Sequence, residues 1–391
     1  MNNNKLHFFI YFIIFSLPFY LARFSVFGIP TNILEAMIVI LFLLFLFKNF
    51  KVLYSLLFIP YSFFQIGIIL LFIGLILSIF QSNDIFSSLG IIKSWFVIPL
   101  LFYIVVKSVL KNKDEKIKAL LALLLSGTLI SIIGLVYFIL ENLTYDNRLQ
   151  AFYEHPNMLA MIIAITAIIL ISKLKVQKEK LLFIILFLLF FILYMTASLG
   201  AWIGLLLALI FYFLSIKYLI LNTKHIHYIL YIIIAIGLLL PIGSIFTNPW
   251  EMGRNSYASR LMVWQASAEI IKDNFVLGIG QADFQDKYLE YQKKFEPYLE
   301  WAVPHPHNLF LQIWLMGGII SLIGFIIILV NVFRKITNYK QIPMCQLTDK
   351  SQFISITVIT ILIYLLFHGF VDNTIWKNDL AIIFWFLIAL I

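Results

Sequence analysis

The feature that most constrains this chain is a series of apolar blocks, each about 17 to 25 residues long, that recurs along almost all of its 391 residues. A helix rises about 1.5 Å per residue, so one such block can cross a hydrocarbon core of about 30 Å. Barrel strands would alternate apolar and polar residues, and these blocks do not. The sequence therefore predicts an all-α, polytopic membrane protein with a single integral membrane domain over residues 1–391.

The blocks predict about twelve transmembrane helices. The run over residues 181–216 is too long for one crossing, so we read it as two helices joined by a polar break at 196–200. The apolar run after Lys5 is longer than a usual signal peptide and lacks an A-x-A cleavage site, so we expect an uncleaved first span. The predicted spans lie near residues 6–22, 31–47, 63–80, 89–106, 118–139, 157–172, 181–196, 199–216, 228–245, 308–333, 352–368 and 378–391.

The net charge of +9 could suggest a nucleic-acid partner, but only 12% of the residues are charged and they lie mainly between the apolar blocks. We therefore expect contacts with membrane lipids and no nucleic acid. Alternate loops hold 18 and 9 Lys and Arg residues, and basic residues in short loops stay on the cytoplasmic side. This asymmetry predicts that both termini are cytoplasmic. The single Cys345 excludes an intramolecular disulfide.

One predicted outer loop, residues 246–306, is much longer than the others. It carries both basic and acidic residues, and loops of this length usually fold or carry function. Within it, residues 259–272 have apolar side chains at helical spacing behind Ser259, a plausible N-cap. We therefore expect a small folded cap on the outer side, with a helix lying on the membrane surface.

A histidine pair precedes the predicted span at 308–333. His307 follows Pro306, which fixes the backbone that enters the helix, and His305 lies two residues earlier. With an ordinary pKa of about 6.5, His307 is suited to take a proton from a hydroxyl group at neutral pH. The alternative is that His307 only caps the helix at the membrane interface and that His305 is a turn residue without a role.

A zinc site made by His305, His307 and His155 is conceivable. Two histidines separated by a proline, with no nearby carboxylate, are a poor zinc motif. We therefore predict no metal and no cofactor.

Several cations on the predicted outer side could contact a phosphate. Arg260 begins the predicted surface helix and Arg254 lies close to it, while Arg148 precedes the sixth span. An arginine side chain matches a phosphate in a bidentate way. Lys93 lies near the outer end of the fourth span and could also reach a phosphate. The alternative for each is a solvated charge or a lipid-headgroup contact.

Three weaker candidates also lie near outer span ends. His368 and Asp372 stand where the eleventh span leaves the membrane, and Glu35 stands near the start of the second span. We expect these three to be structural. Asn157, after His155-Pro156, is expected to cap a helix.

Three segments, taken in order with the predicted topology, resemble the bacterial superfamily of O-antigen ligases and O-antigen polymerases (the Wzy-type C-terminal domain). The approximate ligase-like region is 157–330, and Arg148 of the third segment lies just before it. The three segments are His307-Asn308 with Gly318 after nine further residues, Arg260 and Trp264 with Gly278-Ile279-Gly280, and Arg148 with His155-Pro156-Asn157 and Leu159-Ala160.

The resemblance implies a GT-C-like fold and a lipid-linked glycan transferase of the bacterial inner membrane with a periplasmic active site. Its donor would be a glycan on undecaprenyl diphosphate, and its acceptor a hydroxyl of a lipid A-core sugar in a ligase, or another repeat unit in a polymerase. His307 and Arg260 would be catalytic, the first as general base. The substrate contacts would include Arg148, Arg254, Asn308, His305 and Lys93.

The chain departs from the family pattern in one hairpin. Many members carry Ser-Arg-Gly where this chain has Ser198-Leu199-Gly200, so one expected arginine is missing. We favour the ligase because the spacing from His307-Asn308 to Gly318 is the ligase form, with the polymerase as the alternative. A transporter or flippase is the alternative of another class, but transporters usually hold ionisable residues near mid-membrane.

Overall fold

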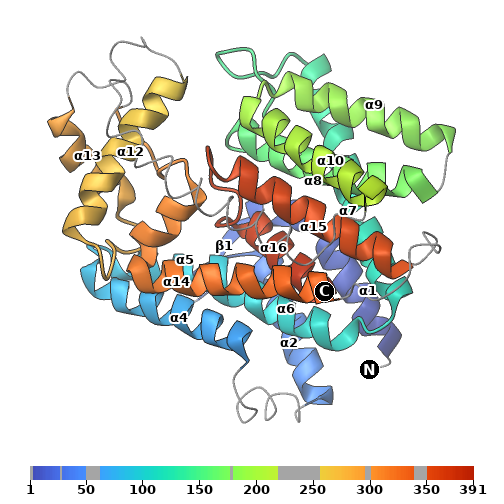
Figure 1. Cartoon of the computed structure of the whole chain (residues 1–391), viewed down its shortest axis with the longest axis horizontal. Coiled ribbons are helices and arrows are strands. Elements are labelled where there is room, and N and C mark those ends of the chain that lie inside the picture. The colour runs from blue at the N-terminus through green and yellow to red at the C-terminus, as the bar shows by residue number, and fades with distance from the viewer. Residues whose placement is uncertain are drawn as a thin grey trace.

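The computed structural model describes residues 3–26, 29–49, 62–176, 179–218, 256–295, 301–338 and 350–391. Of the described residues, 79% are helical (Figure 1), which confirms the prediction of an all-α polytopic membrane protein. Six described helices are long and apolar enough to cross a membrane, and four shorter apolar helices accompany them. The predicted span at 228–245 lies outside the described residues, so the count of about twelve stays a prediction.

The first half of the chain, up to Met195, forms helices that pack both with one another and with those of the second half. Its elements are α1 (Asn3–Phe15), η1 (Leu17–Leu21), β1 (Arg23–Val26), β2 (Ile29–Asn32), α2 (Ile33–Lys48), α4 (Phe63–Ser78), η2 (Ile79–Gln81), α5 (Ile85–Ile92), η3 (Lys93–Val97), α6 (Ile98–Val109), α7 (Lys113–Ile139), α8 (Pro156–Val176) and α9 (Lys180–Met195).

The second half supplies the remaining transmembrane helices and the predicted cap. Its elements are α10 (Leu199–Tyr218), α12 (Ser256–Asp273), α13 (Phe284–Tyr291), η5 (Gln292–Lys294), α14 (Leu309–Asn338), α15 (Lys350–His368) and α16 (Asn378–Leu390). In Figure 1, α12 and α13 stand at one end of α4 and α14.

Polar residues at the helix starts explain several of these boundaries. The Asn32 side chain accepts from the Glu35 backbone N–H at 2.9 Å, and Ser62 and Gln65 form a capping box. These bonds satisfy N–H groups that the first turn of a helix leaves without partners. Short polar side chains thus mark where apolar helices begin.

The first predicted span, 6–22, differs from the structure. Helix α1 ends at Phe15, and a short 3-10 helix with Pro18 in its first turn follows. Proline has no N–H to continue an α-helical ladder. The chain then forms a small antiparallel hairpin in which Arg23 pairs with Asn32. The sequence analysis did not predict this hairpin.

Helices α4 and α14 lie side by side (Figure 1) and pack with their backbones in close contact. A Cβ atom at Gly74 would lie 2.4 Å from the carbonyl oxygen of Gly317, and one at Gly324 would lie 2.4 Å from the backbone nitrogen of Leu71. Small residues let helices approach in this way in membranes. Ser321 adds a hydrogen bond of 2.9 Å to the Leu71 carbonyl.

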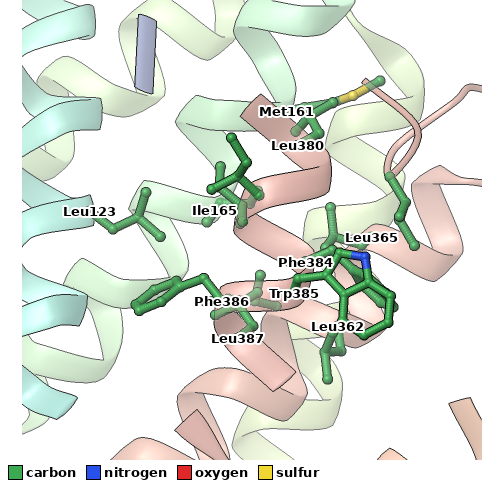
Figure 2. Packing of buried hydrophobic residues seen from close by; sticks show 14 of the residues in the cluster. Leu123, Met161, Ile165, Leu362, Leu365, Leu380, Phe384, Trp385, Phe386 and Leu387 are labelled. Carbon is green, nitrogen blue, oxygen red and sulfur yellow. The ribbon is translucent and has the colours of Figure 1, made fainter. Parts of the chain in front are cut away.

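Helix α16 is the centre of the main core. Every residue from Asp379 to Leu390 is buried. Figure 2 shows its side chains between those of α7, α8 and α15. A helix that is apolar all round is expected only where neighbouring helices or lipid surround it, and here helices do. The labelled residues in Figure 2 are Leu123, Met161, Ile165, Leu362, Leu365, Leu380, Phe384, Trp385, Phe386 and Leu387.

The cap has a second hydrophobic core of its own, built mainly by α12 and α13 around Trp264 and Tyr288. The helix predicted at 259–272 is confirmed as α12, but Ser259 is not its N-cap, because the helix already begins at Ser256. Whether α12 lies on the membrane surface stays a prediction.

A turn after α12 fastens the cap to α14. Helix α14 is kinked at Gly317 and Gly318. Gly318 has a φ of +68°, and a Cβ there would lie 1.8 Å from the Val276 carbonyl oxygen, so only glycine fits. Ile279 donates to the Leu315 carbonyl at 2.8 Å in the same place. The Gly-Ile-Gly motif and the glycine of the His-Asn motif are therefore packed together.

Gln281 strengthens this junction. Its side-chain amide donates to the carbonyl oxygens of Leu75 and Met316 at 3.0 and 2.9 Å and to the Ser78 hydroxyl at 2.6 Å. These acceptors come from both α4 and α14. The cap is thus fastened to the end of α4 and to the first half of α14, which begins just after the histidine loop.

Candidate functional site

The candidate site forms where polar residues from four parts of the chain meet. His305 and His307 precede α14, Asp372 lies between α15 and α16, and Asn157 is the second residue of α8. Arg260 reaches the same loop as Asp372 from α12, because its Nε donates to the Val371 carbonyl at 2.9 Å. Helix ends bring these residues together although they are far apart in sequence.

His307 faces Asp372 across a short gap. Its Nδ1 lies 3.7 Å from Oδ1 of Asp372, and its side chain is 23% exposed. That distance is beyond a hydrogen bond, and Nδ1 is buried without any hydrogen-bond partner. A small approach would make an Nδ1–H donor to the carboxylate and leave Nε2 with its lone pair, as a general base requires.

The backbone of His307 is also unusual. Its φ is +49°, a left-handed conformation that is uncommon for a residue other than glycine. Such residues persist only where their surroundings hold them, and they gather at functional sites. Here Pro306 and the capped start of α14 hold His307 on either side.

His305 supports this arrangement from the other side. Its Nδ1 accepts from the backbone N–H of His307 at 3.3 Å, so its proton resides on Nε2, which lies 4.0 Å from Oδ1 of Asp372. Burial, followed by the nearby His307, lowers the pKa of His305 well below its ordinary value, although Asp372 opposes the shift. His305 is therefore neutral at pH 7 and directs its N–H toward the carboxylate.

Asp372 is the hub of the network. Its Oδ2 accepts from the Asn157 amide at 2.7 Å and its Oδ1 from the Asn373 backbone N–H at 2.8 Å. Burial by itself raises the pKa of Asp372, but the adjacent His307 and then His305 outweigh burial and hold the pKa well below its ordinary value. Asp372 is therefore ionised. The sequence analysis expected a structural role for Asp372 and did not anticipate that it lies beside His305 and His307.

Asn157 joins Asp372 to Arg148. The Arg148 guanidinium donates to Oδ1 of Asn157 at 2.9 Å through Nη2 and to the Thr196 carbonyl at 2.8 Å through Nε. An exposed carboxylate, Asp146, lies 3.9 Å from Nη1, and a contact of that kind neutralises little of the charge. Asn157 thus does more than cap a helix, since it carries a polar chain from Arg148 to Asp372.

His155 has a local role. Its Nδ1 accepts from the backbone N–H of Asn157 at 3.2 Å. Burial lowers the pKa of His155, which favours the neutral form that accepts this bond. His155 shapes the start of α8 beside the network.

Asn308 is fully buried. Its Oδ1 accepts from the backbone N–H groups of Phe310 and Leu311 at 2.9 and 3.0 Å, and its Nδ2 donates to the Phe370 carbonyl at 3.1 Å. These bonds cap α14 and tie it to the loop that holds Asp372. They favour a positioning role over the predicted contact with substrate.

The remaining predicted cations lie apart from this network or outside the described residues. Lys93 forms a salt bridge of 2.8 Å with Glu35 and donates to the Pro30 carbonyl. Glu35 also bonds to Asn32, so both side chains contact the hairpin next to α2, and the structural role expected for Glu35 stays a prediction. Arg254 lies outside the described residues. Leu199, at the position of the missing arginine, is 71% exposed at the start of α10.

His305, His307 and Asp372 could also be read as a metal site, because one donor atom from each lies within 4.8 Å of the others. The sequence argument that no carboxylate lies nearby is wrong, since the loop after α15 brings in Asp372. However, a metal-binding histidine normally donates its second ring N–H to an acceptor, whereas Nδ1 of His305 accepts a bond from His307. The histidines therefore fit proton transfer better than metal binding.

Comparison of the sequence with family models finds a match to one family. Residues 184–326 match the O-antigen ligase family model (Wzy_C). No curated protein sequence matches the chain. The matched segment contains Arg260 and His307, whereas Arg148, Asn157 and Asp372 lie outside it. Members of this family are glycosyltransferase-like enzymes of lipopolysaccharide synthesis. Residues 184–326 of this chain are therefore similar to the O-antigen ligase family.

Proposed function

We propose that this protein is an O-antigen ligase-type glycosyltransferase of the bacterial inner membrane. It moves a glycan from undecaprenyl diphosphate to a hydroxyl of a lipid A-core sugar, or of a similar glycan acceptor. The observation that carries the proposal is the chain of polar contacts from Arg148 through Asn157 and Asp372 to His307, with Arg260 beside it. It combines a base with two cations at one end of the bundle.

In the proposed reaction, Nε2 of His307 removes the proton of the acceptor hydroxyl. The hydroxyl oxygen attacks the anomeric carbon of the donor sugar, and the bond from that carbon to the diphosphate oxygen breaks. The diphosphate leaves with the bonding electrons. Asp372 stabilises the imidazolium that forms and holds Nδ1 toward itself, as a buried carboxylate does for a catalytic histidine elsewhere.

Arg260 and Arg148 are the proposed partners of the departing diphosphate. A diphosphate gains negative charge as its bond to the sugar breaks, and fixed guanidinium groups stabilise that charge. Each guanidinium is oriented by a backbone carbonyl, of Val371 and Thr196 respectively. Arg254 is a further candidate on sequence grounds alone.

Arg148 also offers an answer to the missing family arginine. Its guanidinium bonds to Thr196, three residues before Leu199 in the same hairpin. We propose that Arg148 supplies the second positive charge that Leu199 does not. His305 and Asn308 are proposed as positioning residues, and Lys93 is proposed to act on the hairpin and not on the donor.

The proposed topology has both termini in the cytoplasm and the site in the periplasm. It rests on the basic residues of alternate loops. The diphosphate donor carries its own leaving group, so the proposed reaction requires no nucleotide. The glycan is therefore assembled on its carrier before it reaches this enzyme.

Gene disruption in the native host tests the choice of reaction. Loss of a ligase leaves polymer on its lipid carrier, and loss of a polymerase leaves acceptor that bears a single repeat unit. The first pattern, read from envelope glycans on a gel, is the expected one. Transfer by purified protein without a membrane gradient is also expected, whereas strict dependence on a gradient would favour a transporter.

A further inference from the structure

Four lysines gather at the end of the bundle opposite the candidate site. They come from the end of α6, the turn after it, the start of α7 and the last turns of α14. Helix α14 begins beside the histidine loop, and its basic end lies about 40 Å further along at 1.5 Å per residue. We call these residues the lysine cluster: Lys107, Lys111, Lys116 and Lys335.

The four side chains are close enough to repel one another. The charges of Lys335, Lys111 and Lys116 all act on Lys107. Lys335 and Lys111 act on Lys116 in the same way. Lys107 and Lys116 are half-buried, so these charges lie partly between helices, where water screens them less than on an open surface.

No carboxylate balances this charge within the described part of the chain. The two acidic residues at the start of α7 are engaged elsewhere: Asp114 with Lys350 at 2.6 Å, and Glu115 with His7 at 3.3 Å. No salt bridge among the described residues joins a member of the lysine cluster to an acidic side chain. A concentrated positive charge of this kind calls for an anion that the described part of the chain does not supply.

The ammonium groups are oriented by backbone carbonyls. Lys116 donates to the Leu390 carbonyl at 2.7 Å, and Lys111 donates to the Lys107 carbonyl at 3.1 Å. Each ammonium has three N–H donors, so one such bond leaves donors for an incoming ligand. The cluster is thus a preformed group of donors and not only a set of flexible surface charges.

Apolar surface adjoins the cluster. Arg334 lies over the ring of Phe63 at 5.8 Å, and Phe63 is 46% exposed at the start of α4. A ligand with a phosphate and an acyl chain could contact both the lysines and this surface, whereas a free phosphate would use only the lysines. Basic pockets between transmembrane helices on the cytoplasmic side bind phosphate headgroups in this way.

We propose that the lysine cluster binds the phosphate of an anionic phospholipid headgroup. The lipid belongs to the leaflet at that end of the bundle, and its headgroup bridges α6, α7 and α14. Binding removes the repulsion between Lys107 and Lys335 and thereby ties together helices that also build the opposite site. The site holds a structural lipid and is independent of the transfer reaction.

Thermal unfolding of the purified full chain in zwitterionic detergent tests this proposal. We expect phosphatidylglycerol to raise the melting temperature and phosphatidylcholine to leave it unchanged. In Lys107→Gln/Lys335→Gln the affinity for phosphatidylglycerol should fall about 30-fold, from about five-fold per basic residue near an anionic surface. Lys118→Gln is the matched control, because Lys118 is exposed on α7 and outside the cluster.

A crossed pattern separates lipid binding from a structural role. Without anionic lipid, Lys335→Gln should melt at the wild-type temperature or above it, because a repulsion is removed. With phosphatidylglycerol it should melt below the wild type. Equal stabilisation by both lipids, an equal loss in Lys118→Gln, or full stabilisation by inorganic pyrophosphate without lipid would overturn the proposal.

Discussion

Replacing Asp372 by Asn tests the proposed role of the carboxylate next to His307. The substitution keeps the size of the side chain and still offers Asn157 an oxygen acceptor, but it removes the negative charge next to His307. In the proposed reaction that charge stabilises the imidazolium as the proton moves. The loss should therefore appear in kcat more than in donor binding.

The distance of 3.7 Å between Nδ1 of His307 and Oδ1 of Asp372 sets the magnitude. Two unit charges at that distance attract by about 4 kcal/mol at an effective dielectric constant of about 20. The His307 side chain is partly exposed, so water screens the attraction, and we take about 2 kcal/mol as its lower bound. At 1.36 kcal/mol per factor of ten, kcat should fall between about 30-fold and about 1000-fold.

The assay is transfer by purified protein from a lipid-linked donor, measured across pH. The acid limb of the rate profile should move to lower pH in Asp372→Asn, because the protonated form of the base is no longer stabilised. Asp273→Asn serves as the control, since Asp273 is exposed in the cap and bonds to Tyr291. A variant with unchanged kcat and an unchanged pH profile would refute the role of Asp372.

Three further predictions address packing, protonation and the second cation. Gly318→Ala should destabilise the protein by about 3 kcal/mol or more in thermal unfolding, because its Cβ meets a carbonyl oxygen at 1.8 Å and φ is +68°. Gly90→Ala, where no heavy atom lies within 4 Å, should be neutral or stabilise by up to about 1 kcal/mol. Burial lowers the pKa of His305 in the folded protein. The stability that neutral His305 contributes is therefore present above the unfolded pKa of about 6.5 and is lost as pH falls below that value. Between pH 7 and pH 5 the melting temperature should therefore fall less in His305→Gln than in the wild type. Arg148→Ala should lower the transfer rate about 100-fold, and adding Leu199→Arg should restore part of it.

Each of these three has a contradicting result. Equal stability of the two alanine variants would show that the turn at Gly318 tolerates a side chain. Equal slopes of melting temperature against pH in the wild type and in His305→Gln would show that His305 is not a buried neutral group. An unchanged transfer rate in Arg148→Ala would show that Arg148 does not stabilise the departing diphosphate.

The amino-acid sequence was sufficient for the helical class and for much of the site. The span boundaries follow from apolar length, which is a local property, and polar residues such as Asn32 and Ser62 mark helix starts. The glycine spacing after His307 reflects the kink of α14 at Gly318. These features depend on neighbours in the chain, and a pattern can therefore predict them.

The centre of the site was harder to predict because it depends on contacts between distant residues. Asp372 and Asn157 are 215 residues apart in the sequence, and no local pattern couples them. A useful signal was available, since an acidic residue at the end of an apolar helix is costly unless it is paired. The hairpin at β1 and β2 was missed because both strands are only four residues long.

Transfer by His307→Ala is the most direct test of the central claim. Purified wild type and variant would be compared on the same lipid-linked donor and glycan acceptor, with donor binding and protein level measured in parallel and His7→Ala as the control. We predict a loss of about 100-fold or more in the transfer rate with donor binding retained, since general-base catalysis contributes about 10²- to 10⁴-fold. Transfer within a few-fold of the wild type by a folded, donor-binding His307→Ala protein would contradict the account.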